Sequence, residues 1–137
     1  MAKQLINPPG TERVSASLQF SQAVRIGETI YVSGQVGYGA SGIPDGKEDQ
    51  CRLAFSNLKT VLEYAGATMA DIVSLTSYHT DPLDFDGFKA AQREFIPDKF
   101  PAHTAVGVTS LLLPALKCEL AAIAVIGGSN PPISAAR

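Results

Sequence analysis

The chain has 137 residues, the length of one ordinary domain, and its 11 Lys and Arg against 13 Asp and Glu give a formal net charge of -2. The basic residues are scattered singly, so no basic patch predicts binding to nucleic acid or to an anionic membrane. The two cysteines, Cys51 and Cys118, lie far apart with no second Cys or His at ligand spacing, which argues against a metal site and against a secreted disulfide framework. No segment has the apolar core of a signal peptide or the length of a membrane span, so we expect one cytoplasmic domain over residues 1–137.

The N-terminal part of the chain predicts an arm followed by a β-hairpin. Residues 1–20 contain the sequence Pro-Pro-Gly and are expected to be irregular. Two short runs rich in β-branched and aromatic residues follow, at about Gln22 to Ile26 and Thr29 to Ser33. Gly27 lies between them, where a positive φ costs glycine little. We therefore predict two antiparallel strands joined by a tight turn.

The glycines at 37, 39 and 42 match the dinucleotide-binding pattern G-x-G-x-x-G after a predicted strand. In that motif the third glycine lies in the first helical turn, so that the helix N-terminus meets the pyrophosphate. Here Pro44, Asp45 and Gly46 intervene, and the segment about twenty residues further on is a helix face rather than an acid that ends a second strand. The glycines therefore predict a plain loop.

Two segments have the apolar spacing of amphipathic helices. The first runs from Lys47 to about Ala65 and carries a continuous stripe that includes Cys51, which we therefore place in the core. The second runs from about Asp84 to Phe95 and ends before a proline. Between them, residues 71–80 are rich in β-branched side chains and predict a strand, with His79 on the surface near its end.

The last two predicted strands run from about Ala102 to Val108 and from Lys117 to Ile126. Residues 127–137 are expected to form an irregular C-terminal tail. Both faces of the second are apolar apart from Glu119, so we expect this strand to be central in the sheet. An acid in an apolar strand is costly to bury unless it has a partner or a function. Glu119 is therefore the first candidate catalytic residue.

The predicted order β-β-α-β-α-β-β describes an α+β domain in which two crossover connections place both helices on one face of a mixed sheet. The other face is left without a cover. Because the central strands are apolar on both sides, we expect that face to meet another subunit rather than water. A homo-oligomer with sites at its subunit boundaries follows.

Five short motifs, in the right order, resemble the Rid (YjgF) family of reactive-intermediate deaminases, some of whose members carry ribonuclease or translation-inhibitor labels. They are VSGQ at 32–35, DIV at 71–73, the helix start at 84–85, FPA at 100–102 and LKCELAAIAV at 116–125. The resemblance implies a chorismate-mutase-like subunit of the bacillus type, a homotrimer and three clefts between subunits. It implies no metal and no cofactor, because an imine is already electrophilic.

In deaminating members an Arg after the FPA motif binds the substrate carboxylate, and a Glu on the last strand positions the attacking water. The resemblance implies catalytic roles for Glu119 and for His103, which occupies the position of the Arg. The implied ligand contacts are Phe20 (a Tyr in many members), Ser33, Gly34, Gln35, Lys89 (usually an Asn), Thr104 and Ala105. The chain is thus a divergent form without the substrate-binding Arg. An imidazole is shorter than a guanidinium, binds at one point and is only partly protonated at pH 7.

Three functions stay open on the sequence alone. The first is hydrolytic deamination of a small imine or enamine, with Glu119 orienting water and His103 as anion contact or general acid. The second is a non-catalytic protein that binds a small carboxylate or another metabolite in the same clefts, where Lys89 could supply the charge that His103 lacks. The third is action on RNA, which has no support in the residues because there is no basic stripe and no cluster of aromatics for stacking.

Overall fold

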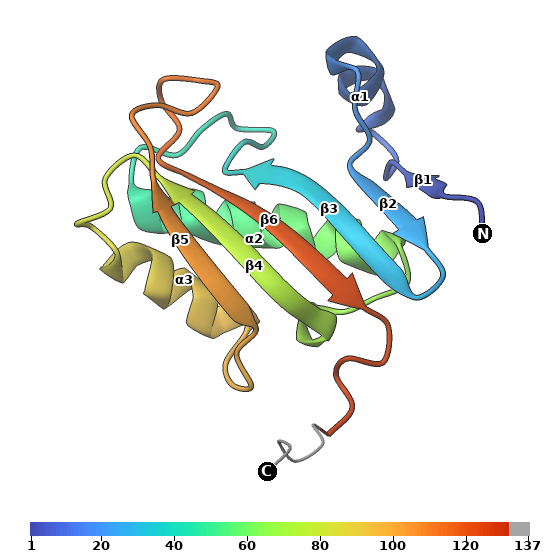
Figure 1. Ribbon diagram of the computed structural model, residues 1–137. Coiled ribbons are helices and arrows are strands. Elements are labelled where there is room, and N and C mark those ends of the chain that lie inside the picture. The colour runs from blue at the N-terminus through green and yellow to red at the C-terminus, as the bar shows by residue number, and fades with distance from the viewer. Residues whose placement is uncertain (132–137) are drawn as a thin grey trace.

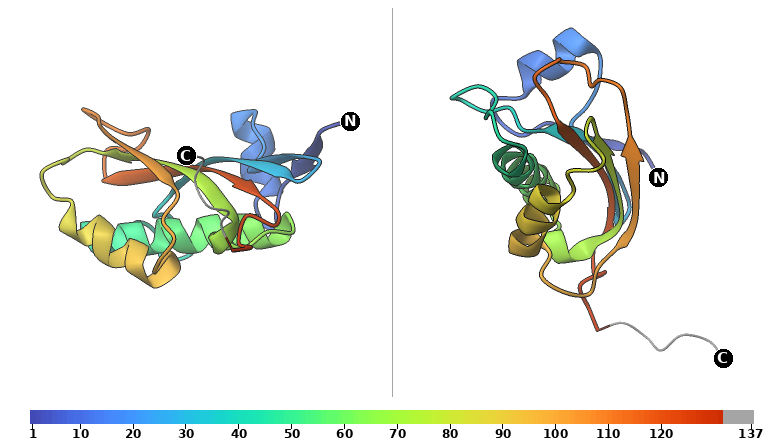
Figure 2. Two further views of the ribbon diagram at one scale, coloured as in Figure 1. Left: turned by 60° about the horizontal axis from the view of Figure 1, so that its bottom comes forward. Right: turned by 90° about the vertical axis from the view of Figure 1, so that its left-hand side faces the viewer.

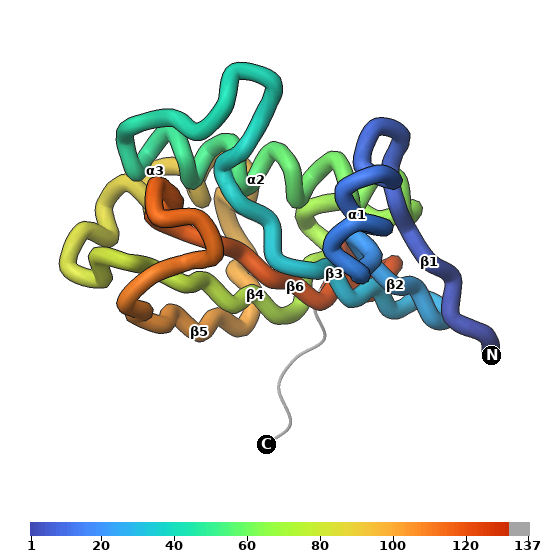
Figure 3. The backbone as a smooth tube through the Cα atoms, turned by 90° about the horizontal axis from the view of Figure 1, so that it is seen from above, coloured from blue at the N-terminus to red at the C-terminus, as the bar shows by residue number. Residues whose placement is uncertain are grey.

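The chain folds into a six-stranded mixed sheet with its two longer helices packed on one of its faces (Figure 1). The computed structural model describes residues 1–131. In chain order the elements are β1 (Gln4–Ile6), α1 (Glu12–Leu18), β2 (Ala23–Ile26), β3 (Thr29–Val36), α2 (Lys47–Tyr64), the short 3-10 helix η1 (Met69–Asp71), β4 (Ile72–His79), α3 (Asp86–Phe95), β5 (Ala102–Gly107) and β6 (Cys118–Val125). The strands lie in the order β1-β2-β3-β6-β4-β5, with β5 at one edge and β1 at the other (Figure 3). Strands β4 and β5 are parallel, and every other neighbouring pair is antiparallel.

The predicted α+β architecture is confirmed. Strand β6 lies between β3 and β4 and is central, as its two apolar faces predict. Helices α2 and α3 cover the same face of the sheet (Figure 2). The residues of β6 that point toward them, Cys118, Leu120, Ala122 and Ala124, are all buried. Within residues 1–131 no helix is both long enough and apolar enough to cross a membrane.

Helix α2 supplies much of the core. Phe55, Leu58 and Leu62 follow one another at three- and four-residue spacing and are fully buried. Cys51 lies on the same stripe, 0% exposed, which confirms its predicted place in the core. The helix is followed by Gly66, whose φ of 97° is the left-handed conformation that commonly ends a helix.

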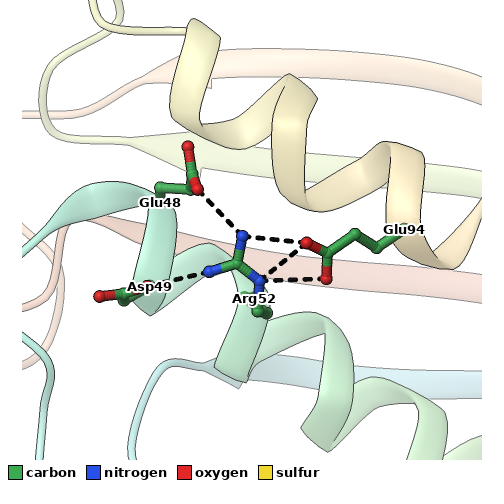
Figure 4. A network of polar contacts seen from close by, with 4 residues as sticks. All are labelled: Glu48, Asp49, Arg52 and Glu94. Carbon is green, nitrogen blue, oxygen red and sulfur yellow. Dashed lines mark hydrogen bonds and ion pairs between the residues drawn. The ribbon is translucent and has the colours of Figure 1, made fainter.

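A charged network on the surface joins α2 to α3 (Figure 4). Arg52 Nε lies 3.0 Å from both carboxylate oxygens of Glu94 in α3. The Arg52 guanidinium also contacts Glu48 and Asp49 of its own helix at 2.9 Å. Because these groups are partly exposed, the network adds little stability, but its paired geometry helps to orient α3 on α2.

The N-terminal segment is more regular than the sequence predicts. Strand β1 pairs with β2, and α1 follows it. Ile6 is 3% exposed in the hydrophobic core, and buried Ser15 accepts a hydrogen bond from Gln22 Nε2 at 3.3 Å. The prediction of an irregular arm over residues 1–20 is therefore wrong, because contacts with a later strand, rather than local periodicity, order this segment. Of the predicted C-terminal tail, residues 127–130 form turns and residues 132–137 lie outside the described part of the chain.

The second face of the sheet is covered by neither α2 nor α3 (Figure 2). We call it the open face. Four half-buried side chains of β6 point to it, those of Glu119, Ala121, Ile123 and Val125. On the flanking strands Tyr31 is 50% exposed and Val73 is 41% exposed. An apolar sheet face with this exposure is typical of a surface that meets a partner.

Candidate functional site

Glu119 lies on the open face, where the backbone of β3 leaves room for its carboxylate. Its neighbours across the sheet are Val36 on β3 and Tyr78 on β4. A Cβ at Gly34 would stand 2.6 Å from Glu119 Oε2 and 2.7 Å from its Cδ, so only a glycine lets the side chain lie in this position. Partial burial raises the pKa of Glu119. The Glu119 carboxylate thus lies close to the backbone of β3 in a partly desolvated environment.

Gly34 owes its position to a bulge in β3 that its neighbours hold in place. The register of β3 against β6 shifts between Val32 and Gln35. Ser33 Oγ donates to the Ser21 carbonyl oxygen at 2.6 Å. Gln35 is buried, and its Nε2 donates to the Gln22 side-chain oxygen at 3.0 Å. Ser33 and Gln35, expected as ligand contacts, are therefore bonded to the chain itself and shape the bulge.

Phe20 is linked to this bulge through the next residue in the sequence, Ser21. It follows α1, is half-buried and donates its backbone N–H to the Ser15 carbonyl oxygen at 3.0 Å. Its neighbour Ser21 is the residue that receives the Ser33 hydroxyl. We call Gly34 and Glu119, with the bulge that supports them, the Glu119 half-site.

His103 lies on the other face of the sheet, beneath α3. It pairs with Leu75 of β4, which is 1% exposed and points to the helices. The His103 ring is stacked on Phe88 with 5.3 Å between ring centroids, and its Nε2 lies 2.7 Å from Ser77 Oγ. Partial burial lowers the pKa of His103, so that the ring is mostly neutral at pH 7.

The same serine also contacts the second histidine of the chain. His79 Nε2 lies 2.7 Å from Ser77 Oγ, and the His79 ring packs against Phe85 and Phe88 with centroids 5.1 Å away. His79 is 1% exposed, so its predicted surface position is wrong: it alternates inward with Leu75 and Ser77, and α3 covers the end of its strand. Burial, followed by the charges of Lys47 and His103, lowers the pKa of His79 from 6.5 to about 4.

The three remaining expected ligand contacts lie on α3 and β5. Lys89 is exposed on α3, directly after Phe88. Ala105 pairs with Ser77 and points to the helix face, whereas Thr104 pairs with Thr76 and points to the open face. We call His103, Ser77, His79 and Phe88 the His103 half-site.

The two candidate catalytic residues do not form one site within a chain. Glu119 pairs with Tyr78 and His103 pairs with Leu75, and these two residues of β4 point to opposite faces of the sheet. Side chains on opposite faces of a sheet are separated by its backbone. The Glu119 and His103 half-sites can therefore act on one ligand only if two copies of the chain each contribute one of them.

Sequence reasoning missed Ser77, His79 and Phe88 as site residues. The signal was present in part: Leu75, Ser77 and His79 alternate along the strand at 71–80, so they share one face. What the pattern lacked was the register that brings His103 beside Ser77. As for metals, the described residues contain no group of three or more His, Cys, Asp or Glu that could hold an ion.

Comparison with known proteins gives four consistent results. The family model described as Endoribonuclease L-PSP matches residues 10–126. The RutC family protein YjgH of Escherichia coli (strain K12) is 42% identical over 107 residues, which cover 76% of this chain and 82% of that protein. A 2-iminobutanoate/2-iminopropanoate deaminase of Dermatophagoides farinae is 36% identical over 110 residues, which cover 78% of this chain and 85% of that protein. The crystal structure of Rv2704 from Mycobacterium tuberculosis, a member of the YjgF/YER057c/UK114 family, has a TM-score of 0.80 at 28% identity and covers 91% of this chain and 100% of its own.

Proposed function

Because the chain belongs to the endoribonuclease L-PSP family, which includes the YjgF proteins, we propose that it hydrolyses a small imine or enamine to a carbonyl compound and ammonia. The observation that carries this proposal is the Glu119 carboxylate, packed against the Gly34 backbone with a raised pKa. A relative that is 36% identical bears the name of an imine deaminase, which supports the same chemistry. The predicted family resemblance is confirmed; the activity is the proposal.

The proposed reaction needs a base and a water molecule. Glu119 accepts a proton from water as the water oxygen forms a bond to the imine carbon, the π pair of the C=N bond moves to nitrogen, and Glu119 returns that proton to the nitrogen. The proton of the new hydroxyl group is then transferred to the amino group, the carbon–nitrogen σ bond breaks with its electron pair leaving on ammonia, and an oxygen lone pair forms the second bond of the carbonyl group. A partly desolvated carboxylate with a raised pKa is a stronger base for this step than a solvated one.

We propose that the site is completed between copies of the chain in a homotrimer of chorismate-mutase-like subunits. Two observations support it: Glu119 and His103 point to opposite faces of the sheet, and the open face carries exposed apolar residues. In this arrangement a small ligand, such as an imino acid, contacts His103 of one copy and Glu119 of the next. Sedimentation that shows only a monomer at micromolar concentration would contradict this step.

The deaminase proposal is tested with imines generated in situ by an amino-acid oxidase from a panel of amino acids. Wild-type protein should accelerate the release of ammonia and keto acid, and Glu119→Gln should lower the rate by about two to four decades. Glu63→Gln, which changes an exposed acid on α2, is the matched control and should keep the wild-type rate. A wild-type rate no faster than that of Glu119→Gln across the whole panel would end the proposal.

A second candidate is ligand binding without turnover, which His103 favours because it stands where deaminating members hold the ligand with an Arg. A thermal-shift screen with small carboxylates, amides and aromatic metabolites tests it, and stabilisation without turnover would support it. Cleavage of RNA is not proposed. Of the two imidazoles, His79 is 1% exposed and cannot reach an RNA strand.

A further inference from the structure

Ser77 lies between the only two imidazole rings of the chain. Its Oγ is 2.7 Å from Nε2 of His79 and 2.7 Å from Nε2 of His103. Ser77 and His79 are 0% and 1% exposed, whereas His103 is on the exposed edge strand β5. His79, Ser77 and His103 thus form a continuous hydrogen-bonded series that leads from the core to the edge of the sheet.

The two hydrogen bonds of Ser77 have a common direction, because a serine hydroxyl carries one hydrogen. It donates to one of the two rings and accepts from the other. In the outward direction His79 donates to Ser77 and Ser77 donates to His103; in the inward direction both bonds are reversed. The direction decides which nitrogen of each ring carries the proton.

The surroundings of His79, at the buried end of these hydrogen bonds, favour the outward direction. His79 Nδ1 is buried and has no hydrogen-bond partner among the described residues. The inward direction would place the proton on that atom and leave a buried N–H unpaired, which is rarer and more costly than an unpaired acceptor. Protonation of both nitrogens would add a charge to the core near the ammonium group of buried Lys47. The proton of His79 therefore belongs on Nε2.

We propose that Ser77 and His79 are positioning residues that hold His103 as the tautomer with its proton on Nδ1. Ser77 donates to His103 Nε2, and the stacked rings of Phe88 and Phe85 hold the plane of the imidazole. The remaining nitrogen, Nδ1, points away from Ser77 and carries the only N–H of the ring. His103 thus offers one hydrogen-bond donor and no base at that atom.

This form of His103 implies a role in the site, a consequence that rests on the proposed function. A neutral imidazole with a fixed N–H can polarise an acceptor oxygen or nitrogen of a ligand, as other enzymes use a neutral histidine. It cannot form the paired, charged contact that a guanidinium makes with a carboxylate. His103 would therefore orient and polarise the ligand, and proton removal from water would be left to Glu119.

The tautomers are measured directly by long-range proton–nitrogen correlation NMR on uniformly ¹⁵N-labelled protein at about pH 7.5, where free histidine is mostly neutral. The chain has only 2 histidines, so His103→Gln assigns both sets of signals. We expect His79 to be protonated on Nε2 and His103 on Nδ1. A His103 ring protonated on Nε2, or on both nitrogens, would overturn the proposal.

A pair of variants then tests the part played by Ser77. In Ser77→Ala the His103 Nε2 atom loses the hydrogen bond that Ser77 donates. The ratio of the two His103 tautomers should then reverse in favour of the form protonated on Nε2. Ser74→Ala makes the same change on the opposite face of β4 and should leave the wild-type ratio. An unchanged ratio in Ser77→Ala would overturn the proposal, and the wild-type spectrum decides the tautomer even if this variant fails to fold. No substrate is present, so the outcome is independent of whether the protein turns over an imine.

Discussion

Buried His79 should make the folded chain sensitive to mild acid. Burial and the charges of Lys47 and His103 lower its pKa from 6.5 to about 4. Between these two values the unfolded chain binds a proton at His79 and the folded chain does not, so the free energy of unfolding falls as the pH falls through this window. The contribution of His79 is complete above the unfolded pKa and is lost by about pH 4.

The size of the effect follows from the lowering of the pKa of His79 from 6.5 to about 4. One pKa unit corresponds to about 1.4 kcal/mol, so the full loss is about 3 kcal/mol. Acidification from about pH 7 to about pH 5 already removes about 2 kcal/mol, because at the lower pH His79 is protonated in nearly all unfolded molecules and in few folded ones.

Urea unfolding followed by circular dichroism measures this effect. Wild type and His79→Gln are compared at both pH values and at one fixed subunit concentration, because association adds to the apparent stability. The glutamine can still donate to Ser77 but does not titrate, so the variant should lose about 2 kcal/mol less than wild type on acidification. His103→Gln is the comparison variant: because the His103 ring is exposed and loses less solvation on folding than the His79 ring, it should change the acid sensitivity less than His79→Gln does. Equal losses in wild type and His79→Gln would refute the reasoning.

Three further predictions concern Glu119 and the cysteines. Gly34→Ala should displace the Glu119 carboxylate, because the new Cβ would lie 2.6 Å from Oε2, and should lower deaminase kcat/KM by about tenfold or more. Gly46→Ala is the control: nothing lies within 4 Å of its new Cβ, so kcat/KM should not change. If both variants keep full activity, the position of the carboxylate against β3 does not matter. Because burial raises the pKa of Glu119 above its ordinary 4.5, the acid limb of kcat/KM should have its midpoint above pH 4.5, and a lower midpoint would contradict its role as base. Cys51 and Cys118 lie 2.9 Å apart between their sulfurs and are 0% exposed, so a thiol reagent should modify neither in the native protein and both in denaturant; rapid modification of the native protein would contradict their burial.

The sequence by itself determined the elements with strong periodicity and the family. The apolar stripe over residues 47–65 predicts α2, because a helix that buries one face must repeat its apolar residues every three to four positions. Apolar residues on both faces of the last strand predict the central place of β6 and an open face behind it. The motifs from 32–35 to 116–125 predict the family to which the comparisons assign the chain.

Only the tertiary structure decided which of these residues meet. Strand β1 forms because it pairs with the otherwise free edge of β2, and the local sequence pattern of β1 does not predict this pairing. His79 is buried because α3 covers it, and that packing depends on contacts between residues far apart in the chain. The register of β4 against β5 and β6 places His103 beside Ser77 and Glu119 on the opposite face. A shift by one residue would reverse the face of every side chain in a strand, so the composition of the site depends on strand pairing, which the order of residues within a single strand does not reveal.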